Sequence, residues 1–375
     1  MNIILTCGGT GGHIYPAIAV AKLFQERRPD CRILFIGADD GMEKDIVPRE
    51  GFELKTLKIS NYQRKLTPKA MAHNVKTLWN MTGSLRKASR ILREFEADVI
   101  IGTGGYASFP ALREGAKAGI PTIVHESNAV PGLTTRMVEK RVDRVMVSFE
   151  ESRSHYTHPE RVAVTGMPVR EAFLYQDRQS ARKALGLDER PLVVSCWGSL
   201  GAREMNKKIA EFMKCECADG APLQHIHATG SFGWKWMPEY VAQQGVDLSA
   251  HPEVDMREYI YDMPTVMAAA DLIICRAGAA TIGEVCASGT PCIMVPSPNV
   301  TDNHQEKNAR VLEGRGAALV VREADCTGES LYRLTRELLS DPQRCEAMRR
   351  AARSLAVVDA AERIYETALE VSKAR

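Results

Sequence analysis

The sequence contains a loop whose residue types suit proton transfer beside a tightly held polar ligand. Residues 5–21, LTCGGTGGHIYPAIAVA, comprise an apolar strand, a loop with four glycines in five residues, and a helix opened by Pro16. Glycines there expose backbone N–H groups at a helix N-terminus, where an oxyanion binds well. We therefore expect Thr10, Gly11 and Gly12 to bind substrate. The imidazole of His13 titrates near neutral pH, so His13 is a candidate general base, with helix capping as the alternative.

Two common nucleotide-binding interpretations of this loop fail. A dinucleotide fingerprint requires G-x-G-x-x-G, and its last glycine is replaced by Ile14. A P-loop requires Gly-Lys-Ser/Thr, and neither the lysine nor the hydroxyl follows. The loop is therefore more suited to an oxyanion or to a hydroxyl about to lose its proton, and a nicotinamide dehydrogenase is disfavoured.

Polar residues also follow two later strands of the first half. The segment GTGGYASFP (102–110) contains Tyr106, and HESNAVPG (125–132) contains Glu126 and Asn128. Three strand ends with such residues in one half of the chain indicate a binding site. Glu126 is a second candidate for the proton acceptor, and the sequence does not decide between it and His13.

The second half repeats the pattern with residues that suit a nucleotide. In CWGSLGAREMN (196–206), Ser199 and the amides near Gly201 suit a phosphate. In CRAGAATIGEVCASGTP (275–291), Arg276 suits a diphosphate and Glu284 suits the two hydroxyls of a ribose. The segment PSPNVTDNHQEKNA (296–309) contains His304 and Gln305, which suit sugar hydroxyls, although an ordinary loop is also polar.

The elements that must position these residues alternate between apolar strands and helices. Strands are predicted at 2–7, 32–37, 98–103, 121–126 and 143–149, and again at 191–196, 223–229, 271–276, 291–296 and 317–321. Continuous apolar strands separated by helices are typical of parallel sheets covered on both faces. We expect an α/β protein with two doubly wound domains, joined near residues 163–170, and ligands at the carboxyl ends of the strands.

Composition excludes several classes of function. The formal net charge of the 375 residues is only +2, which argues against nucleic acid as a partner. The ten cysteines lack CxxC zinc spacing, and the chain begins directly with a strand, so we expect reduced thiols in a cytoplasmic protein without a signal peptide. No apolar run reaches the ~18 residues that a membrane span needs.

Taken together, these stretches resemble the MurG-type glycosyltransferases. The matching segments are GGTGGHIYPAIAVA, GTGGYASFP, HESNAVPGLTTR, GMPVR, GSLGAREMN, DMPTVMAAADLIICRAGAATIGEV and DNHQEKNA, in the family's order over residues 8–309. The resemblance implies a GT-B fold, in which two Rossmann-like domains face each other across a cleft. It implies an acceptor domain at 1–165, a donor domain at 166–349, and a C-terminal helix at 350–375 that packs back on the first domain.

The resemblance also implies a reaction and its partners. The family transfers N-acetylglucosamine, with inversion, from UDP-N-acetylglucosamine to the muramoyl C4 hydroxyl of undecaprenyl-linked lipid I, forming lipid II for peptidoglycan. The enzyme would act without metal or cofactor as a peripheral protein on the cytoplasmic face of the bacterial plasma membrane, with other cell-wall synthesis proteins as candidate partners. The alternatives are another GT-B enzyme with a lipid acceptor, or a non-catalytic protein that binds sugar nucleotides.

Site residues follow from the same resemblance. His13 and Asn128 match positions near the acceptor and the sugar, and His304 and Gln305 match the pair that contacts N-acetylglucosamine. Four further positions match contacts with diphosphate, uracil or ribose: Arg170, Ser199, Ile260 and Glu284. The chain departs from the family at Trp197, which replaces a glycine beside the expected phosphate turn, and at Ser127, Thr135, Tyr261 and His304.

One segment has the charge pattern of a membrane-facing surface. Residues 60–93 contain eight basic and no acidic residues: Arg64, Lys65, Lys69, Lys76, Arg86, Lys87, Arg90 and Arg93. Met71, Val75, Leu78 and Leu85 fall roughly on one helical stripe, with Trp79 beside it. Either this stripe packs on the sheet as in an ordinary amphipathic helix, or the segment contacts an anionic membrane surface.

Overall fold

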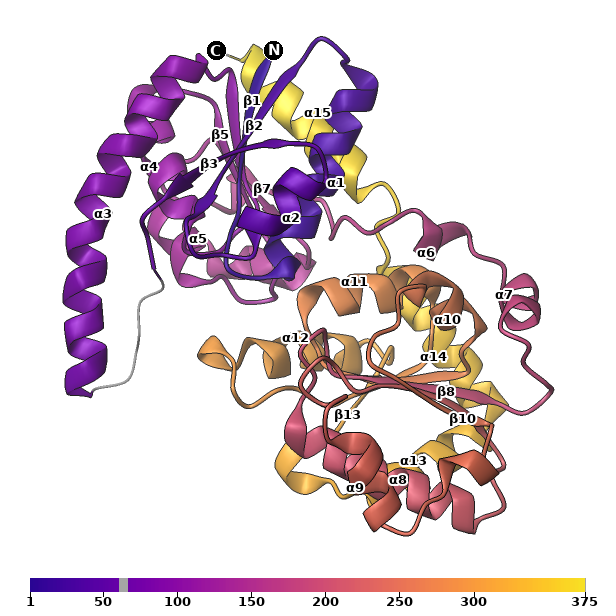
Figure 1. Ribbon diagram of the computed structural model, residues 1–375. Helices are drawn as coiled ribbons and strands as arrows, with labels where there is room; N and C mark the ends of the chain where they lie inside the picture. The colour runs from indigo at the N-terminus through magenta and orange to yellow at the C-terminus, as the bar shows by residue number, and fades with distance from the viewer. Residues whose placement is uncertain (61–66, 375) are drawn as a thin grey trace. The chain divides into compact units, whose positions relative to one another are not determined.

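The computed structural model describes residues 1–60 and 67–374, and the chain forms two compact units (Figure 1). The first unit comprises Met1–Val169 together with Asp359–Arg375, and the second comprises Arg170–Val358. Each unit is built on its own parallel sheet. The predicted α/β class with two parallel sheets is therefore confirmed.

The first unit contains a seven-stranded sheet in the order β3-β2-β1-β4-β5-β6-β7, with every neighbouring pair parallel. The strands are β1 (Asn2–Thr6), β2 (Arg32–Ala38), β3 (Glu53–Leu57), β4 (Val99–Gly102), β5 (Thr122–Glu126), β6 (Arg144–Val147) and β7 (Val162–Val164). The central strands β1, β4 and β5 consist almost entirely of buried residues. The three polar loops predicted to form a site therefore follow three strands that are adjacent in the sheet.

Helices cover both faces of this sheet. They are α1 (Gly11–Arg27), α2 (Glu43–Arg49), α3 (Pro68–Phe95), α4 (Ser108–Ala118), α5 (Leu133–Val138) and α15 (Ala360–Lys373). Because side chains alternate along a strand, Ile3 and Leu5 pack with α1 and α15, whereas Ile4 packs with α3 and α4. The period-two alternation of β1 thus provides two cores, one on each face.

The second unit contains a six-stranded parallel sheet in the order β10-β9-β8-β11-β12-β13. Its strands are β8 (Leu192–Cys196), β9 (Gln224–Ala228), β10 (Val254–Arg257), β11 (Leu272–Cys275), β12 (Cys292–Met294) and β13 (Leu319–Val320). Its helices are α6 (Ala172–Tyr175), α7 (Arg178–Ala184), α8 (Arg203–Ala218), α9 (Met237–Gln243), α10 (Met263–Ala269), α11 (Ala279–Ser288), α12 (His304–Gly314), α13 (Gly328–Leu339) and α14 (Pro342–Leu355). Here too the glycine-rich turns join carboxyl ends of strands to helix N-termini.

Every predicted strand is present, and three strands were not predicted. These are β3, β7 and β10, and each is the outermost strand of its sheet. An edge strand is less fully covered, so β3 (ELKTL) and β10 (VDMR) contain polar residues and form no continuous apolar run. The strand β7 lies where the sequence indicated only the junction between domains.

The C-terminal helix α15 belongs to the first unit. The ring of Tyr365 lies 4.7 Å from that of Phe24 on α1, measured between centroids, and Ile364 and Ala368 join the buried core around β1. Only the last six residues of α14, 350–355, fall in the segment expected to pack back, and the whole helix lies in the second unit, where it contacts α11. The first unit also extends to Val169, four residues beyond the expected limit of 165.

Candidate active site

The first two glycine loops of unit 1 are in direct backbone contact. Gly105 adopts a left-handed conformation (φ +82°), and a Cβ at this position would overlap the carbonyl oxygen of Gly8. Only glycine allows this approach. The third loop is attached to the second, because the Thr134 hydroxyl donates to the carbonyl oxygen of Gly105 at 3.1 Å. The structure therefore brings together the loops after β1, β4 and β5.

His13 is held by the neighbouring loop through two hydrogen bonds. Its Nδ1 atom lies 3.0 Å from the carbonyl oxygen of Thr103, and the Thr103 hydroxyl donates to the carbonyl oxygen of His13 at 2.6 Å. A carbonyl oxygen can only accept, so Nδ1 carries the ring proton. The lone pair of the neutral imidazole then resides on Nε2, which is the atom able to accept a proton.

The carboxylate of Glu126 accepts four hydrogen bonds, three from the loop that follows it and one from the start of α5. Oε1 accepts from the backbone N–H and the side-chain amide of Asn128, both at 3.0 Å. Oε2 accepts from the Gly132 N–H at 2.9 Å and from the Thr135 hydroxyl at 2.6 Å. The side chain is buried. These contacts favour Glu126 as a residue that shapes the loop and orients Asn128, rather than as the proton acceptor.

Tyr106 lies beside the first glycine loop, where a Cβ on Gly9 would be 3.1 Å from its ring. Burial, followed by the negative charges of Asp40, Glu43 and Asp39, raises the pKa of Tyr106 to about 12. The phenol is therefore neutral at physiological pH and can donate a hydrogen bond to a ligand at this edge.

In unit 2, the turn after β8 is also built on close backbone contact. Gly201 (φ +78°) approaches Thr229 and Gly230 in the loop after β9, and Ser199 is exposed at the tip of the turn. The carbonyl oxygen of Ser199 accepts from the Ser231 N–H at 3.1 Å. The turn thus presents Ser199 at the carboxyl edge of the sheet, in the place expected for a phosphate contact.

Glu284 lies on α11, half-buried, and its carboxyl group is strongly perturbed. Burial raises the pKa of Glu284 to about 7, and the positive charge of Arg170 acts in the opposite direction. Two residues expected to bind the donor are therefore close enough to interact. Hydrogen bonds from a ligand would stabilise the ionised form of this carboxyl group, which burial disfavours.

Arg276 directly follows β11, as the sequence indicated, and its side chain contacts other residues of unit 2. Its guanidinium pairs with Glu323 at 2.6 Å, donates to the carbonyl oxygen of Val295 at 3.0 Å, and lies over the ring of Trp197 at 5.5 Å. Trp197 itself is only 4% exposed and belongs to the core of unit 2. The Trp197 ring therefore faces the interior of unit 2, and the Arg276 guanidinium contacts Glu323, Val295 and Trp197.

The remaining expected donor residues lie at loops of the same sheet edge. Gln305 accepts from the Ser297 N–H at 2.9 Å, and His304 Nδ1 lies 2.8 Å from the carbonyl oxygen of Thr301. The two residues before them have left-handed backbones, Asp302 (φ +58°) and Asn303 (φ +50°), a strain found more often at functional sites. Ile260 is buried between two exposed tyrosines, Tyr259 and Tyr261.

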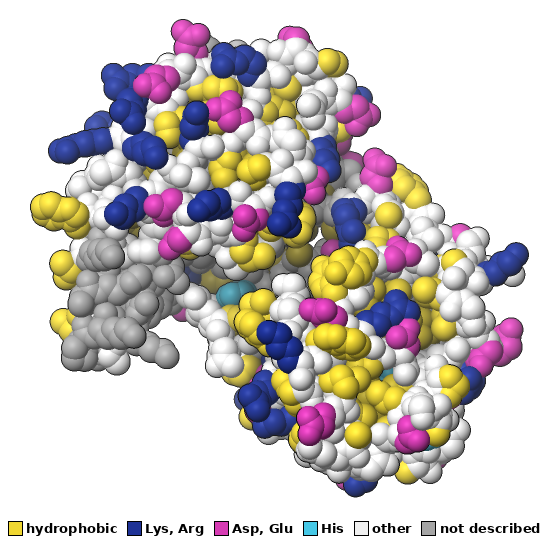
Figure 2. Space-filling view, in the orientation of Figure 1, with side chains coloured by type: hydrophobic (Ala, Val, Ile, Leu, Met, Phe, Trp, Pro, Cys, Tyr) yellow, Lys and Arg dark blue, Asp and Glu magenta, His cyan; other side chains and the backbone are white. Residues whose placement is uncertain are grey.

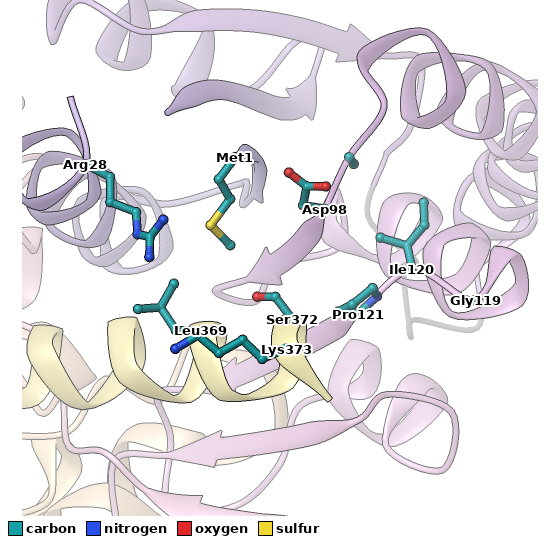
Figure 3. A pocket seen from close by; sticks show the side chains of 10 residues that line it. Met1, Arg28, Asp98, Gly119, Ile120, Pro121, Leu369, Ser372 and Lys373 are labelled. Carbon is teal, nitrogen blue, oxygen red and sulfur yellow. The ribbon is translucent and has the colours of Figure 1, made fainter. Parts of the chain in front are cut away.

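A cavity of about 450 Å³ lies at the opposite, amino edge of the first sheet (Figure 3). Its lining includes Met1, Arg28, Asp98 and Lys373. The helices α1 and α15 end beside it, and basic residues at helix C-termini complement the helix dipoles. Ligands of such sheets bind at the carboxyl edge, so this cavity is not part of the candidate site.

Within residues 1–60 and 67–374, no group of three or more His, Cys, Asp and Glu side chains is arranged to hold a metal ion. In the same residues, no helix combines the length and the apolarity needed to cross a membrane.

Comparison with known proteins identifies the family. Residues 3–147 match the glycosyltransferase family 28 N-terminal domain, and residues 192–364 match the family 28 C-terminal domain. The chain is 43% identical over 366 residues to the UDP-N-acetylglucosamine--N-acetylmuramyl-(pentapeptide) pyrophosphoryl-undecaprenol N-acetylglucosamine transferase of Thermoanaerobacter sp. (strain X514), which covers 97% of this chain and 98% of the relative. It is 40% identical over 374 residues to the transferase of the same name from Acetivibrio thermocellus, covering 100% and 99%.

The chain belongs to this N-acetylglucosamine transferase family. A crystal structure of MurG from Acinetobacter baumannii aligns with a TM-score of 0.77 at 26% identity, covering 98% of this chain and 99% of that one. The predicted family and the GT-B fold are confirmed.

For this transferase, the sequence did not indicate the role of Glu43. The residue is fully buried, and its carboxylate contacts the first glycine loop. It lies in the polar segment DDGMEKD, where a buried carboxylate has no sequence signature of its own.

Proposed function

We propose that the chain transfers N-acetylglucosamine from UDP-N-acetylglucosamine to the C4 hydroxyl of the muramoyl group of lipid I, forming lipid II. The observation that carries this function is the 43% identity to a named transferase over nearly the full length of both chains. The His13 geometry supports it, because the reaction requires a group that removes a proton from a sugar hydroxyl.

In this proposal, unit 1 binds the acceptor and His13 is the base. The acceptor oxygen attacks C1 of N-acetylglucosamine while Nε2 of His13 takes its proton. The bond between C1 and the diphosphate oxygen breaks, and UDP leaves from the opposite face, so the α-linked donor gives a β-1,4 product. Glu126 holds the loop that positions Asn128, while Tyr106 and the Thr10–Gly12 amides bind the acceptor or the sugar.

Unit 2 binds UDP-N-acetylglucosamine at the carboxyl edge of its sheet. Glu284 accepts both ribose hydroxyls, and backbone groups at Ile260 bind the uracil. Ser199, Arg170 and the N-terminal amides of α11 stabilise the charge of the departing diphosphate, which is the part of catalysis that a fixed array of donors performs best. His304 and Gln305 bind the sugar hydroxyls.

We further propose that α3 places the enzyme on the cytoplasmic face of the plasma membrane, against anionic lipid. Met71, Val75 and Trp79 are 61%, 68% and 81% exposed, and their spacing of four residues puts them on one stripe of the helix. In Figure 2, hydrophobic side chains project at the left of the view beside the lower part of α3, and Lys and Arg side chains project beside its upper part.

The expected stripe on α3 divides into an exposed and a buried part. Leu85 packs against the core, as in an ordinary amphipathic helix, whereas Met71, Val75 and Trp79 remain exposed. Arg86, Lys87, Arg90 and Arg93 are exposed on the same helix. Arg64, Lys65 and Leu66 lie outside the described residues, as do the side chains of Lys69, Lys76 and Leu78.

The deciding experiment is incubation of the protein with labelled UDP-N-acetylglucosamine and a lipid I analogue. The expected result is a labelled disaccharide with a β-1,4 link. Transfer to diacylglycerol instead would assign another lipid acceptor, and binding of the donor without any transfer would assign a non-catalytic role. Heat-denatured protein and a His13→Ala variant are the controls.

A further inference from the structure

The carboxylate of Glu43 contacts the backbone of the first glycine loop. Glu43 is the first residue of α2, and its side chain is fully buried. Oε1 accepts from the N–H of Ala38, the last residue of β2, at 2.7 Å, and Oε2 accepts from the N–H of Gly9 at 3.2 Å. One carboxylate therefore connects the end of β2 to the loop after β1.

Three glycines leave space for this side chain. A Cβ on Gly8 would be 2.7 Å from Oε1 of Glu43, and a Cβ on Gly37 or Gly41 would also overlap Glu43. On its other side, Gly8 faces the second glycine loop, where a Cβ would be 2.5 Å from that of Ala107. The loop is thus held between Glu43 on one side and the loop after β4 on the other.

Burying a carboxyl group costs folding free energy unless hydrogen bonds compensate for the lost contacts with water. Among the described residues, Glu43 has no Lys, Arg or His partner within ion-pair distance, and its two oxygens accept instead from the backbone N–H groups of Ala38 and Gly9. A position that required only packing would be filled by an apolar residue at lower cost.

The contact with Glu43 lies at the turn that leads into α1. Gly9, whose N–H donates to Glu43, has a left-handed backbone (φ +90°), and the next residue, Thr10, is the N-cap of α1. The N–H of His13 bonds to the carbonyl oxygen of Thr10 at 3.1 Å, so the position of the imidazole depends on the same turn.

We propose that Glu43 is a positioning residue for the transfer reaction, whose buried carboxylate fixes the shape of the first glycine loop and thereby the place of His13. The inference rests on the proposed function, in which His13 is the base. Glu43 acts through the backbone and does not contact the substrate.

The test compares Glu43→Gln with Asp45→Asn in the full-length protein. Gln keeps the size of the side chain, but its NH₂ group must face one of the two N–H donors, so one hydrogen bond is lost and a donor opposes a donor. Asp45 lies exposed in the same first turn of α2 and controls for the loss of one negative charge there.

We expect Glu43→Gln to lower kcat by about 10- to 100-fold, the effect of misplacing a catalytic group by about an ångström. The KM for UDP-N-acetylglucosamine, which binds unit 2 in the proposal, should change less than about threefold. Hydrogen exchange at the amides of Gly9 to Gly12 should accelerate while the amides of β1 and β4 remain protected. Asp45→Asn should match the unchanged protein in all three measurements.

Unchanged kcat in Glu43→Gln would overturn the proposal, as would a loss of activity that only follows the fraction of unfolded protein. Glu43→Ala leaves both donors unpaired and should be at least as impaired as Glu43→Gln. If the unchanged protein fails to transfer sugar to lipid I, the proposed function fails, but the exchange rates at Gly9 to Gly12 still decide whether Glu43 holds the loop.

Discussion

The Nδ1 atom of His13 lies 3.0 Å from the carbonyl oxygen of Thr103, and the Thr103 side chain bonds back to the carbonyl oxygen of His13. This reciprocal pair fixes the tautomer of the ring and joins the two glycine loops of the first sheet. It is the same arrangement by which many catalytic histidines are oriented through their second nitrogen.

Replacing His13 should remove the base without affecting the donor site. We expect His13→Gln to lower kcat by about 10²- to 10⁴-fold, the usual contribution of general base catalysis, with the affinity for UDP unchanged. Steady-state kinetics with a lipid I analogue and calorimetry with UDP measure the two effects. Thr103→Val, which loses only the hydroxyl, should cause a smaller decrease. Near-normal turnover by His13→Gln would assign the base elsewhere.

Binding of UDP should depend on pH through Glu284. With its pKa raised to about 7 by burial, the carboxylate is mostly protonated at pH 6 and mostly ionised at pH 8. If only the ionised form accepts both ribose hydroxyls, affinity for UDP rises by about tenfold over this interval. In Glu284→Gln, the affinity for UDP can depend on pH only through ionisation of the UDP phosphate. The difference between the pH profiles of the wild-type protein and the variant is therefore the contribution of Glu284. Identical pH profiles would remove Glu284 from the ribose site.

The same shift predicts an opposite effect on stability. Between the ordinary pKa of 4.5 and the folded value of about 7, the folded protein binds more protons at Glu284 than the unfolded chain does. Stability of unit 2 therefore falls as pH rises through this window, by on the order of 3 kcal/mol at 1.36 kcal/mol per pKa unit. Glu284→Gln should be free of this decrease and more stable at pH 8, as measured by urea unfolding. A variant less stable than the unchanged protein at pH 8 would contradict this.

Arg276 should act on stability and not on the donor. Its ion pair with Glu323 is largely buried, so Arg276→Gln leaves a buried carboxylate unpaired and should cost about 3 kcal/mol or more of unfolding free energy. The affinity for UDP at a temperature where the variant is folded should change less than about threefold. Weakening of UDP binding by more than tenfold would instead assign Arg276 to the diphosphate site.

Charge reversal on α3 should release the enzyme from anionic vesicles. Each basic residue near such a surface contributes about 1 kcal/mol, so replacing Arg86, Lys87 and Arg90 by Glu should weaken binding by at least about 100-fold. Trp79→Ser should also weaken it. UDP binding should persist in both. Reversal at three exposed basic residues of unit 2, Lys183, Lys214 and Arg350, is the matched control. Unchanged sedimentation with vesicles would exclude α3 as the contact.

Most of the fold could be predicted because buried parallel strands leave a clear pattern. Continuous apolar runs such as NIILT and LVVSC are required wherever both faces of a strand are covered. The edge strands β3 and β10 lack this requirement, so no apolar run indicated them. The glycine loops were recognisable because close backbone contacts, such as that of Gly105 with Gly8, admit no other residue.

The partners of charged side chains could not be predicted, because they depend on contacts between distant segments. Arg276 and Glu323 are separated by 47 positions, and nothing near either residue indicates the pair. Glu43 accepts a hydrogen bond from Gly9, which is 34 positions away in the sequence. The side chain of Trp197 is buried in the core, although the next two residues, Gly198 and Ser199, are exposed. Residue type indicated what each group could do, and only the tertiary structure shows what it contacts.

Because α15 packs on the first sheet, unit 1 consists of two separate segments of the chain, whereas unit 2 consists of one. Residues 170–358 form a continuous stretch that contains its whole core, whereas residues 1–169 lack the helix whose Ile364 and Ala368 cover the face of β1. A gene fragment ending before residue 359 would therefore damage the N-terminal half of the protein, although the deletion lies at the other end of the sequence. For the same reason, a fusion at the C-terminus is attached to the half that carries His13.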